Sequence, residues 1–182
     1  MEIIAIAATS LDGYITRSDN PGTAFTSEAD KTWFSKTIKP FDFKIMGRRT
    51  FDVSKEYLLP LTTNDSRDKR IVMTNQPKVY KHLEVSNRLE FTSKTPLEIA
   101  TVIQESGIIH PKVAILGGSF IYSAFLNAGL IKEFWITIEP LLFGSGISLL
   151  QSMPKVALIL KESSEIGPST LLLKYSCDYN SN

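Results

Sequence analysis

Cysteine and histidine are almost absent from the 182 residues of this sequence. Cys177 is its single cysteine, and His82 and His110 are its two histidines. One cysteine excludes a disulfide within the chain and any zinc site built from two or four cysteines, and two histidines are too few for a histidine-rich metal site. We therefore expect no metal site, and so few thiols are typical of a protein from the reducing cytoplasm.

An excess of one charge and long apolar runs are also lacking. Lysine and arginine number 20, aspartate and glutamate 19, which leaves a formal net charge of +1. This balance gives no global field for nucleic acid or an anionic membrane surface, so neither is expected as a partner. No apolar run approaches the roughly 18 residues of a membrane span, and acidic Glu2 stands where a signal peptide carries positive charge. We expect a cytoplasmic protein that acts on a small molecule.

The overall amino-acid composition is typical of one globular domain. Hydrophobic residues make up 43% of the chain and charged residues 21%, close to the averages of about 45–50% and 25% for folded proteins. The length is also within the usual range of a single domain. We expect one domain over residues 1–178, followed by a tail at 179–182.

Short apolar runs alternate with helical patterns along the chain. We expect strands at residues 3–8, 43–46, 70–74, 113–116 and 133–138, helices at 27–38, 95–106 and 119–128, and loops at 16–26 and 54–68. Runs at 156–166 and 170–175 flank Gly167 and Pro168, which predicts an antiparallel hairpin. The alternation favours an α/β fold with a central, mostly parallel mixed sheet, helices on both faces and an antiparallel C-terminal hairpin.

Two glycines separate the strand expected at 113–116 from the helix expected at 119–128. Gly117 and Gly118 allow a ligand to approach the main chain, and the free N–H groups of a helix start favour a phosphate. The alternative, about equally supported by the two glycines alone, is an ordinary turn whose glycines relieve packing.

A similar arrangement occurs after the strand expected at 43–46. Residues 47–50, Gly-Arg-Arg-Thr, add two guanidinium groups suited to phosphate, although a solvated helix start is the common alternative. Thr74 and Asn75 end a third strand and offer hydroxyl and amide donors, or simply terminate it. Phosphate sites at several strand ends suggest a dinucleotide, but no Gly-x-Gly-x-x-Gly fingerprint follows the first strand. Glu139, about 20 residues past the glycine pair, is a candidate ribose ligand.

Asp30 is the candidate acid. It lies three residues before Trp33 and four before Phe34, so one helix face carries all three, and partial burial beside a planar ligand would raise the pKa of the carboxyl. Ser27 and Asp30 also have the spacing of a capping box, so Asp30 is alternatively only a helix cap. No Ser/His/Asp or Cys/His set stands out, which gives nucleophilic hydrolysis little support.

Six segments follow one another in an order that is itself informative. They are Ala7-Ala8 with Asp12-Gly13-Tyr14-Ile15, Ala29–Phe34, Ile45–Thr50, Met73–Pro77, Ile115–Tyr122 and Thr137. In this order they resemble the dihydrofolate reductase-like superfamily, over residues 3 to about 150. Agreement over all six is much more specific than any one motif.

The resemblance implies NADPH as cofactor and assigns roles to individual residues. Arg48, Arg49 and Thr50 would hold the adenosine phosphates of NADPH. The other implied cofactor-binding residues are Ala8, Ile15, Gly47, Thr74, Asn75, Gly117, Gly118, Ser119, Phe120 and Ile121. Asp30, hydrogen-bonded to Thr137, would orient and help protonate a pyrimidine or pterin ring. The implied substrate-binding residues are Ala7, Thr26, Ser27 and Phe34.

Within the superfamily, some segments are similar to the reductase domain of riboflavin biosynthesis. They are Ser10-Leu11-Asp12-Gly13, the Thr26-Ser27 pair, Gly117–Ser119, Ala128–Glu133 and Pro140–Gly146. Enzymes of that branch reduce a ribosylaminopyrimidine 5′-phosphate with NADPH. No deaminase half accompanies the domain, so the resemblance implies reduction alone.

The sequence departs from both branches. Asp68 stands where folate reductases place an arginine for the glutamyl carboxylate, with Arg67 and Arg70 beside it. Conversely, Asp30 and residues 47–50 are like folate reductases and unlike the riboflavin branch. The leading hypothesis is a riboflavin-type, NADPH-dependent reductase, the second a dihydrofolate or other pterin reductase, and the third a non-catalytic nucleotide-binding protein of the same fold.

The apolar run 134–136 leaves the oligomeric state open. With the C-terminal strands, Phe134, Trp135 and Ile136 are a candidate seam of a homodimer. The same residues are equally suited to the core of a single chain, and the core is the safer interpretation.

Overall fold

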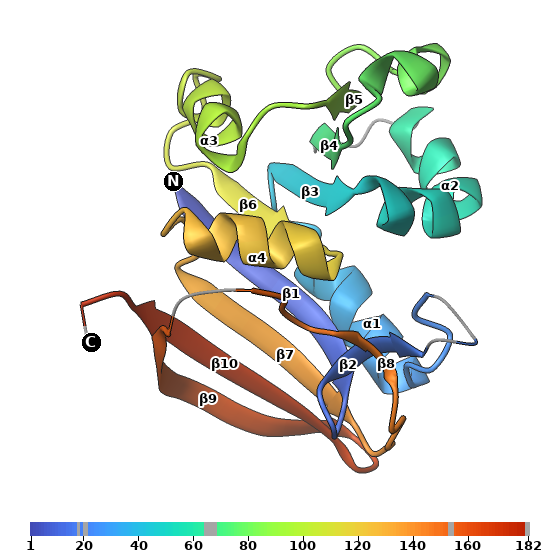
Figure 1. Ribbon diagram of the computed structural model, residues 1–182, viewed down its shortest axis with the longest axis vertical. Coiled ribbons are helices and arrows are strands. Elements are labelled where there is room, and N and C mark those ends of the chain that lie inside the picture. Colours follow the sequence, from blue (N-terminus) through green and yellow to red (C-terminus); the bar gives the residue numbers. More distant parts are fainter. Residues whose placement is uncertain (18, 20–21, 64–68, 153–154, 181–182) are drawn as a thin grey trace.

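An eight-stranded sheet forms the centre of the computed structural model, which describes residues 1–17, 19, 22–63, 69–152 and 155–180 (Figure 1). In spatial order its strands are β5 (Leu89–Thr92), β4 (Lys69–Met73), β3 (Phe43–Gly47), β6 (Lys112–Ile115), β1 (Glu2–Ser10), β7 (Glu133–Glu139), β10 (Thr170–Asp178) and β9 (Ala157–Gly167). The first six pair in parallel, and β10 and β9 continue the sheet as an antiparallel hairpin. The expected mostly parallel mixed sheet with a C-terminal hairpin is confirmed.

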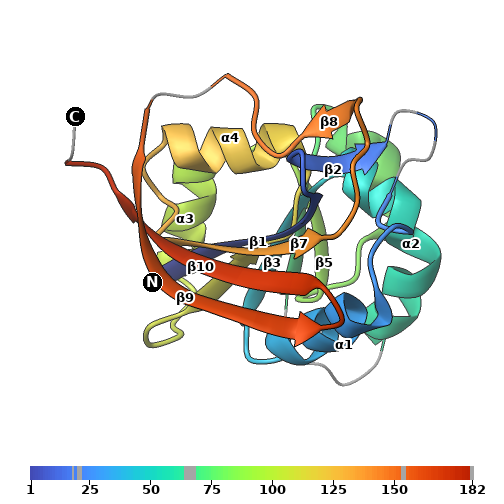
Figure 2. The same ribbon diagram turned by 90° about the horizontal axis from the view of Figure 1, so that it is seen from below.

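Helices cover both faces of this sheet (Figure 2). The helices are α1 (Glu28–Thr37), α2 (Arg48–Thr63), α3 (Pro96–Gln104) and α4 (Ser119–Asn127), with a 3₁₀ helix, η1, at Pro77–Leu83. Side chains of α3 and α4 pack with Ile3 and Ile45 on one face. Those of α1 pack with Ile4 and Ile6 on the other, because neighbouring strand residues point to opposite faces.

The central strand β1 explains why its sequence is a continuous apolar run. Residues 3–7 are all buried, and the strand pairs with β6 on one side and β7 on the other. With helices above and below it, neither face of β1 meets water, so an alternating pattern is not required.

A correction concerns residues 54–68, which were expected to form a loop. Residues 54–63 instead continue α2, and residues 64–68 lie outside the described part of the chain. The turn-forming residues occur only in the last turn of the helix. Before them, Phe51, Leu58 and Leu59 have the spacing of one helix face and pack against Met46 and Val72.

The first two residues of the loop expected at 16–26 form the end of a strand, and residues 18, 20 and 21 lie outside the described part of the chain. Strand β2 (Tyr14–Arg17) pairs antiparallel with β8 (Gly146–Ser148) in a separate two-stranded sheet. Its partner is distant in sequence, so the local pattern gives no sign of it. Gly146 fits this pairing closely, since a Cβ there would lie 2.2 Å from the carbonyl oxygen of Thr16.

The C-terminal hairpin lies against the first turn of α1. A Cβ on Gly167 would lie 2.3 Å from the Cβ of Ala29. We expect Gly167→Ala to displace this turn and to lower the free energy of unfolding by about 1–3 kcal/mol, the usual cost of overpacking. Urea denaturation measures the change, with Ser163→Ala, exposed on the same strand, as a control within about 0.5 kcal/mol of the parent. Equal stabilities of the two variants would contradict this packing.

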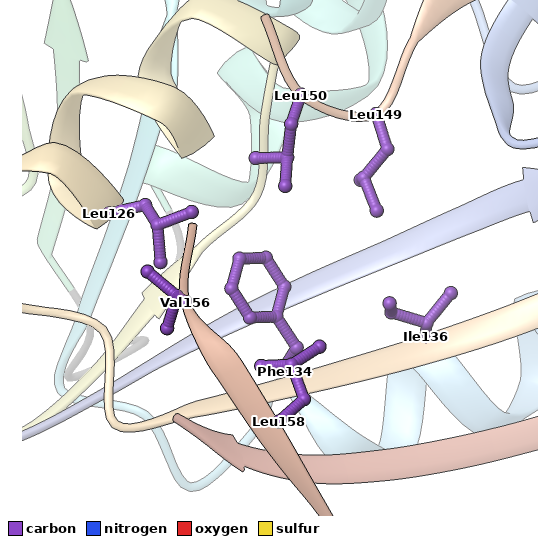
Figure 3. A pocket seen from close by; sticks show the side chains of 7 residues that line it. All are labelled: Leu126, Phe134, Ile136, Leu149, Leu150, Val156 and Leu158. Carbon is purple, nitrogen blue, oxygen red and sulfur yellow. The ribbon is translucent and has the colours of Figure 1, made fainter. Parts of the chain in front are cut away.

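A small apolar pocket lies beside the core (Figure 3). Its volume is about 60 Å³ and its lining residues are Leu126, Phe134, Ile136, Leu149, Leu150, Val156 and Leu158. It offers no polar side chain to orient a ligand, and small-molecule sites have about 300 Å³ or more. We interpret it as a packing gap.

Phe134, 2% exposed, belongs to the core, as does the partly buried Trp135. None of the helices in the described ranges has the length and apolar character that a membrane crossing needs.

Candidate active site

A cleft of about 1390 Å³ runs along the carboxyl ends of the parallel strands. Its lining comes from β1, β3, β4 and β5, from the turn after β6, from α1, α2 and α4, and from β2 with the segment that follows it. Ligands of open α/β folds bind at this end of the strands. The volume exceeds the roughly 300–1,000 Å³ typical of a site for one small molecule, so two ligands have room side by side.

Nearly all predicted site residues meet in this cleft. Those that line it are Ala7, Ala8, Ile15, Thr26, Asp30, Phe34, Gly47, Arg48, Arg49, Thr50, Thr74, Asn75, Gly117, Gly118, Ser119, Phe120 and Ile121. The other two, Ser27 and Thr137, lie behind the lining, where each is hydrogen-bonded to Asp30. Segments far apart in the chain thus contribute to one surface.

Asp30 lies in the first turn of α1, lines the cleft and is 6% exposed. The hydroxyl of Thr137, on β7, donates a hydrogen bond of 2.6 Å to its Oδ1. Burial raises the pKa of the Asp30 carboxyl; the hydrogen bond from Thr137 opposes this shift, and the negative charge of Glu139 adds to it. The net direction is upward, which is what a proton donor beside a bound ring requires.

The cap of α1 is made by other residues. Ser27 is the N-cap, and its Oγ accepts a hydrogen bond of 3.2 Å from the backbone N of Asp30. In a capping box the carboxylate of Asp30 would accept a hydrogen bond from the backbone N of Ser27. Here this N donates to Oε1 of Glu139 instead, at 2.9 Å. The Asp30 carboxyl is therefore free to face Thr137 and the cleft, and the alternative that it only caps the helix does not hold.

Glu139 is not a ribose ligand in this structure, contrary to the expectation from its distance to the glycine pair. Its side chain is 2% exposed and is absent from the cleft lining. Besides the Ser27 backbone, it accepts hydrogen bonds from Ser27 Oγ (3.0 Å) and Thr170 Oγ1 (3.1 Å). The physical reason is the strand period: Glu139 lies two residues after Thr137 and so points to the same face, under α1.

The N-termini of α2 and α4 lie next to each other in the part of the cleft that does not contain Asp30. The backbone N of Gly47 donates to the carbonyl of Gly117 at 2.7 Å, which joins the turn before α2 to the turn before α4. Neither first turn contains an acidic residue. The positive ends of both helix dipoles therefore face the same region, a favourable place for the phosphates of one extended ligand.

The glycine turn leaves space for a ligand at the main chain. Gly117 has φ +112°, and a Cβ there would lie 3.3 Å from the hydroxyl oxygen of Tyr122 and 3.6 Å from Oγ1 of Thr50. The peptide bond between Gly117 and Gly118 is cis. Ser119 Oγ is buried and has no hydrogen bond to any described residue. A buried hydroxyl and free helix N–H groups at one turn are the donors that a phosphate needs.

Arg48 is held in place by partners that sequence reasoning missed. Its Nη1 lies 2.7 Å from Oδ2 of Asp52, one helical turn later, and the hydroxyl of Tyr80 donates to the same carboxylate. Tyr80 comes from η1, so no local spacing links it to Arg48. Arg49 has no comparable restraint and is exposed.

The turn after β1 is tied to a distant segment. Asp12 accepts hydrogen bonds from Ser10 Oγ (2.5 Å) and from the backbone N of Phe143 and Gly144. The bond from Ser10 is the largest cause that lowers the pKa of Asp12. This anchors the start of the segment that carries Ile15 and Thr26 into the cleft.

Comparison with known proteins decides which family has this arrangement. The RibD C-terminal domain family matches residues 2–172. The chain belongs to this family. Among curated proteins, the uncharacterized protein YwjB of Bacillus subtilis is 30% identical over 174 residues, which cover 91% of this chain and 92% of YwjB.

Solved structures show the RibD C-terminal domain fold throughout the chain. A pyrimidine reductase-like protein from Corynebacterium diphtheriae superimposes with a TM-score of 0.74 and 16% identity, covering 98% of this chain and 92% of that one. RibD of Acinetobacter baumannii gives a TM-score of 0.76 and 16% identity, covering 97% of this chain and 58% of that longer one. At these identities the likeness concerns the fold, which is dihydrofolate reductase-like, as the sequence predicts.

This RibD C-terminal domain also has two basic side chains in its cleft that were not among the expected site residues. Lys44 and Arg70 line the cleft, are 4% exposed each, and are neighbours in register on β3 and β4. Their signal in the sequence is a charge within each apolar strand. Arg67 and Asp68, which mark the departure from folate reductases, lie outside the described residues.

Proposed function

We propose that this chain is an NADPH-dependent reductase of the riboflavin-pathway type, which reduces a ribosylaminopyrimidine 5′-phosphate by hydride transfer. The observation that carries the proposal is the placement of Asp30, held from behind by Thr137, in the same cleft as the two helix N-termini. A proton donor and a phosphate cradle on one surface are what a dinucleotide-dependent reductase requires. The family and the reductase-like neighbours support the same class.

The glycine turn fits the pyrophosphate of a dinucleotide. Methyl groups at Gly117 and Gly118 would lie 3.6 Å and 3.5 Å from Thr50 Oγ1, so glycine keeps this surface open. The N–H groups at the starts of α2 and α4 and the buried hydroxyl of Ser119 are the donors. Arg48, oriented by Asp52, is the guanidinium for an adenosine phosphate, with exposed Arg49 beside it. When bound, NADPH supplies the hydride.

The chain itself positions the substrate and supplies the balancing proton. Thr137 fixes the Asp30 carboxyl through Oδ1, and this carboxyl lines the cleft where the substrate would bind. Reduction of the opened ribose adds a hydride to its C1 carbon and a proton to the attached nitrogen. Burial raises the pKa of the Asp30 carboxyl and so favours its protonated form, which supports this carboxyl as the donor in the chain.

A specific observation favours dihydrofolate as the second candidate substrate. Asp30, which the sequence shares with folate reductases and not with the riboflavin branch, is buried in the cleft wall and hydrogen-bonded to Thr137. Lys44 and Arg70 are compatible with both substrates, since a phosphate and a glutamyl carboxylate are both anions. The two candidates therefore have to be separated by assay.

Binding and turnover test this proposal in sequence. NADPH at about 100 times its Kd is expected to raise the Tm by roughly 5–10 °C, because it stabilises only the native state. The absorbance of the reduced nicotinamide then reports oxidation with each substrate. Oxidation with the ribosylaminopyrimidine phosphate supports the proposal. Oxidation with dihydrofolate alone would contradict it, and a protein whose Tm does not respond to NADPH would exclude both reductases.

A further inference from the structure

A second carboxylate lies buried behind the acid of the cleft. Glu139 takes no part in the lining, yet it accepts hydrogen bonds from the backbone N and Oγ of Ser27 and from Oγ1 of Thr170. The backbone N–H can only donate, and both hydroxyls can donate, so both carboxyl oxygens of Glu139 have a hydrogen-bond partner.

Only one hydroxyl separates this carboxylate from the backbone of Asp30. Ser27 Oγ lies 3.0 Å from Glu139 Oε1 and also accepts the hydrogen bond from the Asp30 N. On β7, Thr137 and Glu139 are two residues apart and point to the same face. Thr137 therefore holds the side chain of Asp30, and Glu139 holds the first turn of the helix that carries it.

The groups facing Asp30 are of unequal effect. Burial in the cleft wall is the largest influence and raises the pKa of Asp30; Thr137 and Thr26 lower it through hydrogen bonds. Lys31 also lowers it, but this lysine is exposed and is paired with Glu28 at 2.7 Å, so water screens it. Glu139 is the buried like charge in this set, and it raises the pKa of Asp30 by less than burial does.

We propose that Glu139 is a positioning residue for the reaction: it fixes the first turn of α1 on β7 and places a like charge behind the carboxyl of Asp30. This inference rests on the proposed function, because it assigns to Asp30 the part of proton donor. Its electrostatic content is independent of turnover, since the titration of Asp30 can be followed in the protein without substrate.

The decisive variant is Glu139→Gln, which keeps the size and the acceptor oxygen and removes the charge. Aspartate labelled with ¹³C at Cγ reports the titration of Asp30, whose signal is assigned by its loss in Asp30→Asn. We expect the titration midpoint of Asp30 to fall by about half a pH unit or more in Glu139→Gln. Glu133→Gln is the matched control: it removes a charge from the same face of β7, six residues away, and should leave the midpoint unchanged.

The pH profile of kcat/KM gives the second readout. Turnover needs protonated Asp30, so the rate falls as pH rises through its pKa, and this limb should move to lower pH in Glu139→Gln. A uniform loss of rate with an unchanged limb and midpoint would mean that Glu139 is only structural and would overturn the proposal. If the parent protein shows no turnover, the proposed function fails while the titration still tests the inference.

A second variant guards against misfolding of Glu139→Gln. The double change Glu139→Met with Thr170→Val removes the charge together with a hydroxyl that donates to it, and leaves the N–H and Oγ of the partly exposed Ser27 to pair with water. The Asp30 midpoint is expected to fall in this variant as well. An unchanged midpoint in either folded variant would contradict the proposal.

Discussion

Asparagine at position 30 is expected to lower kcat by about 10²–10⁴-fold, the usual contribution of a general acid, and to leave the affinity for NADPH unchanged. The amide can still accept the hydrogen bond from Thr137, so the geometry of the cleft is preserved. What is lost is the proton that balances the hydride. Single-turnover rates with saturating NADPH measure the chemical step, and isothermal titration measures the affinity.

The same variant is expected to gain stability at neutral pH. The pKa of Asp30 is raised in the folded protein, so the stability that this carboxyl contributes is fully present below its unfolded pKa and is lost as pH rises through its folded pKa. An amide does not ionise and avoids this loss. We expect Asp30→Asn to raise the Tm at pH 7 and not at pH 3.

Glu28→Gln is the control for both measurements. It changes the same charge in the same helical turn, but Glu28 is exposed and lies outside the cleft lining. Neither turnover nor Tm should change appreciably. A turnover of Asp30→Asn equal to that of Glu28→Gln would show that Asp30 is no acid in the reaction.

Alanine at position 117 is expected to weaken NADPH binding tenfold or more and to abolish most of the thermal shift given by the cofactor. Gly117 has φ +112°, a region that residues with a Cβ rarely adopt, at a cost of about 1–3 kcal/mol. The added methyl group would also lie tightly against the hydroxyl of Tyr122, at 3.3 Å, where the turn must stay open. A difference of 1.4 kcal/mol in binding already corresponds to the tenfold loss.

Gly129→Ala separates the effect on binding from the effect of strain. Gly129 has φ +66° and open space around its Cα, and it does not line the cleft. This variant should lose stability like Gly117→Ala while the thermal shift with NADPH remains that of the parent. If both alanine variants respond equally to NADPH, the glycine turn does not bind the cofactor.

The parts of the fold that could be predicted are those with local signals. The buried run of β1, the glycines before α4 and the hairpin around Gly167 each have a pattern within about ten residues, and all three are present. Residues 54–63 were predicted wrongly because Pro60 and two threonines outweighed the apolar face of α2. Pairing of β2 with β8 joins segments about 130 residues apart, and no local pattern records it.

In the candidate site, too, some residues could be predicted from the sequence and others could not. Asp30 and Thr137 could be paired from the resemblance, and their hydrogen bond is present in the structure. Glu139 was left open as a ribose ligand because spacing along the chain says nothing about the face of β7 to which a side chain points. The support of Arg48 by Asp52 and Tyr80 depends on η1, an element that the sequence did not predict.

The most direct measurement of the central claim follows the hydride itself. The protein is incubated with the ribosylaminopyrimidine 5′-phosphate and NADPH that carries deuterium at the transferred position of the nicotinamide ring, and the product is analysed by mass spectrometry and NMR. A reductase of the riboflavin type predicts one deuterium per product molecule, at C1 of the ribityl chain, with greatly reduced formation in Asp30→Asn. A product without deuterium, or transfer to dihydrofolate only, would contradict the account.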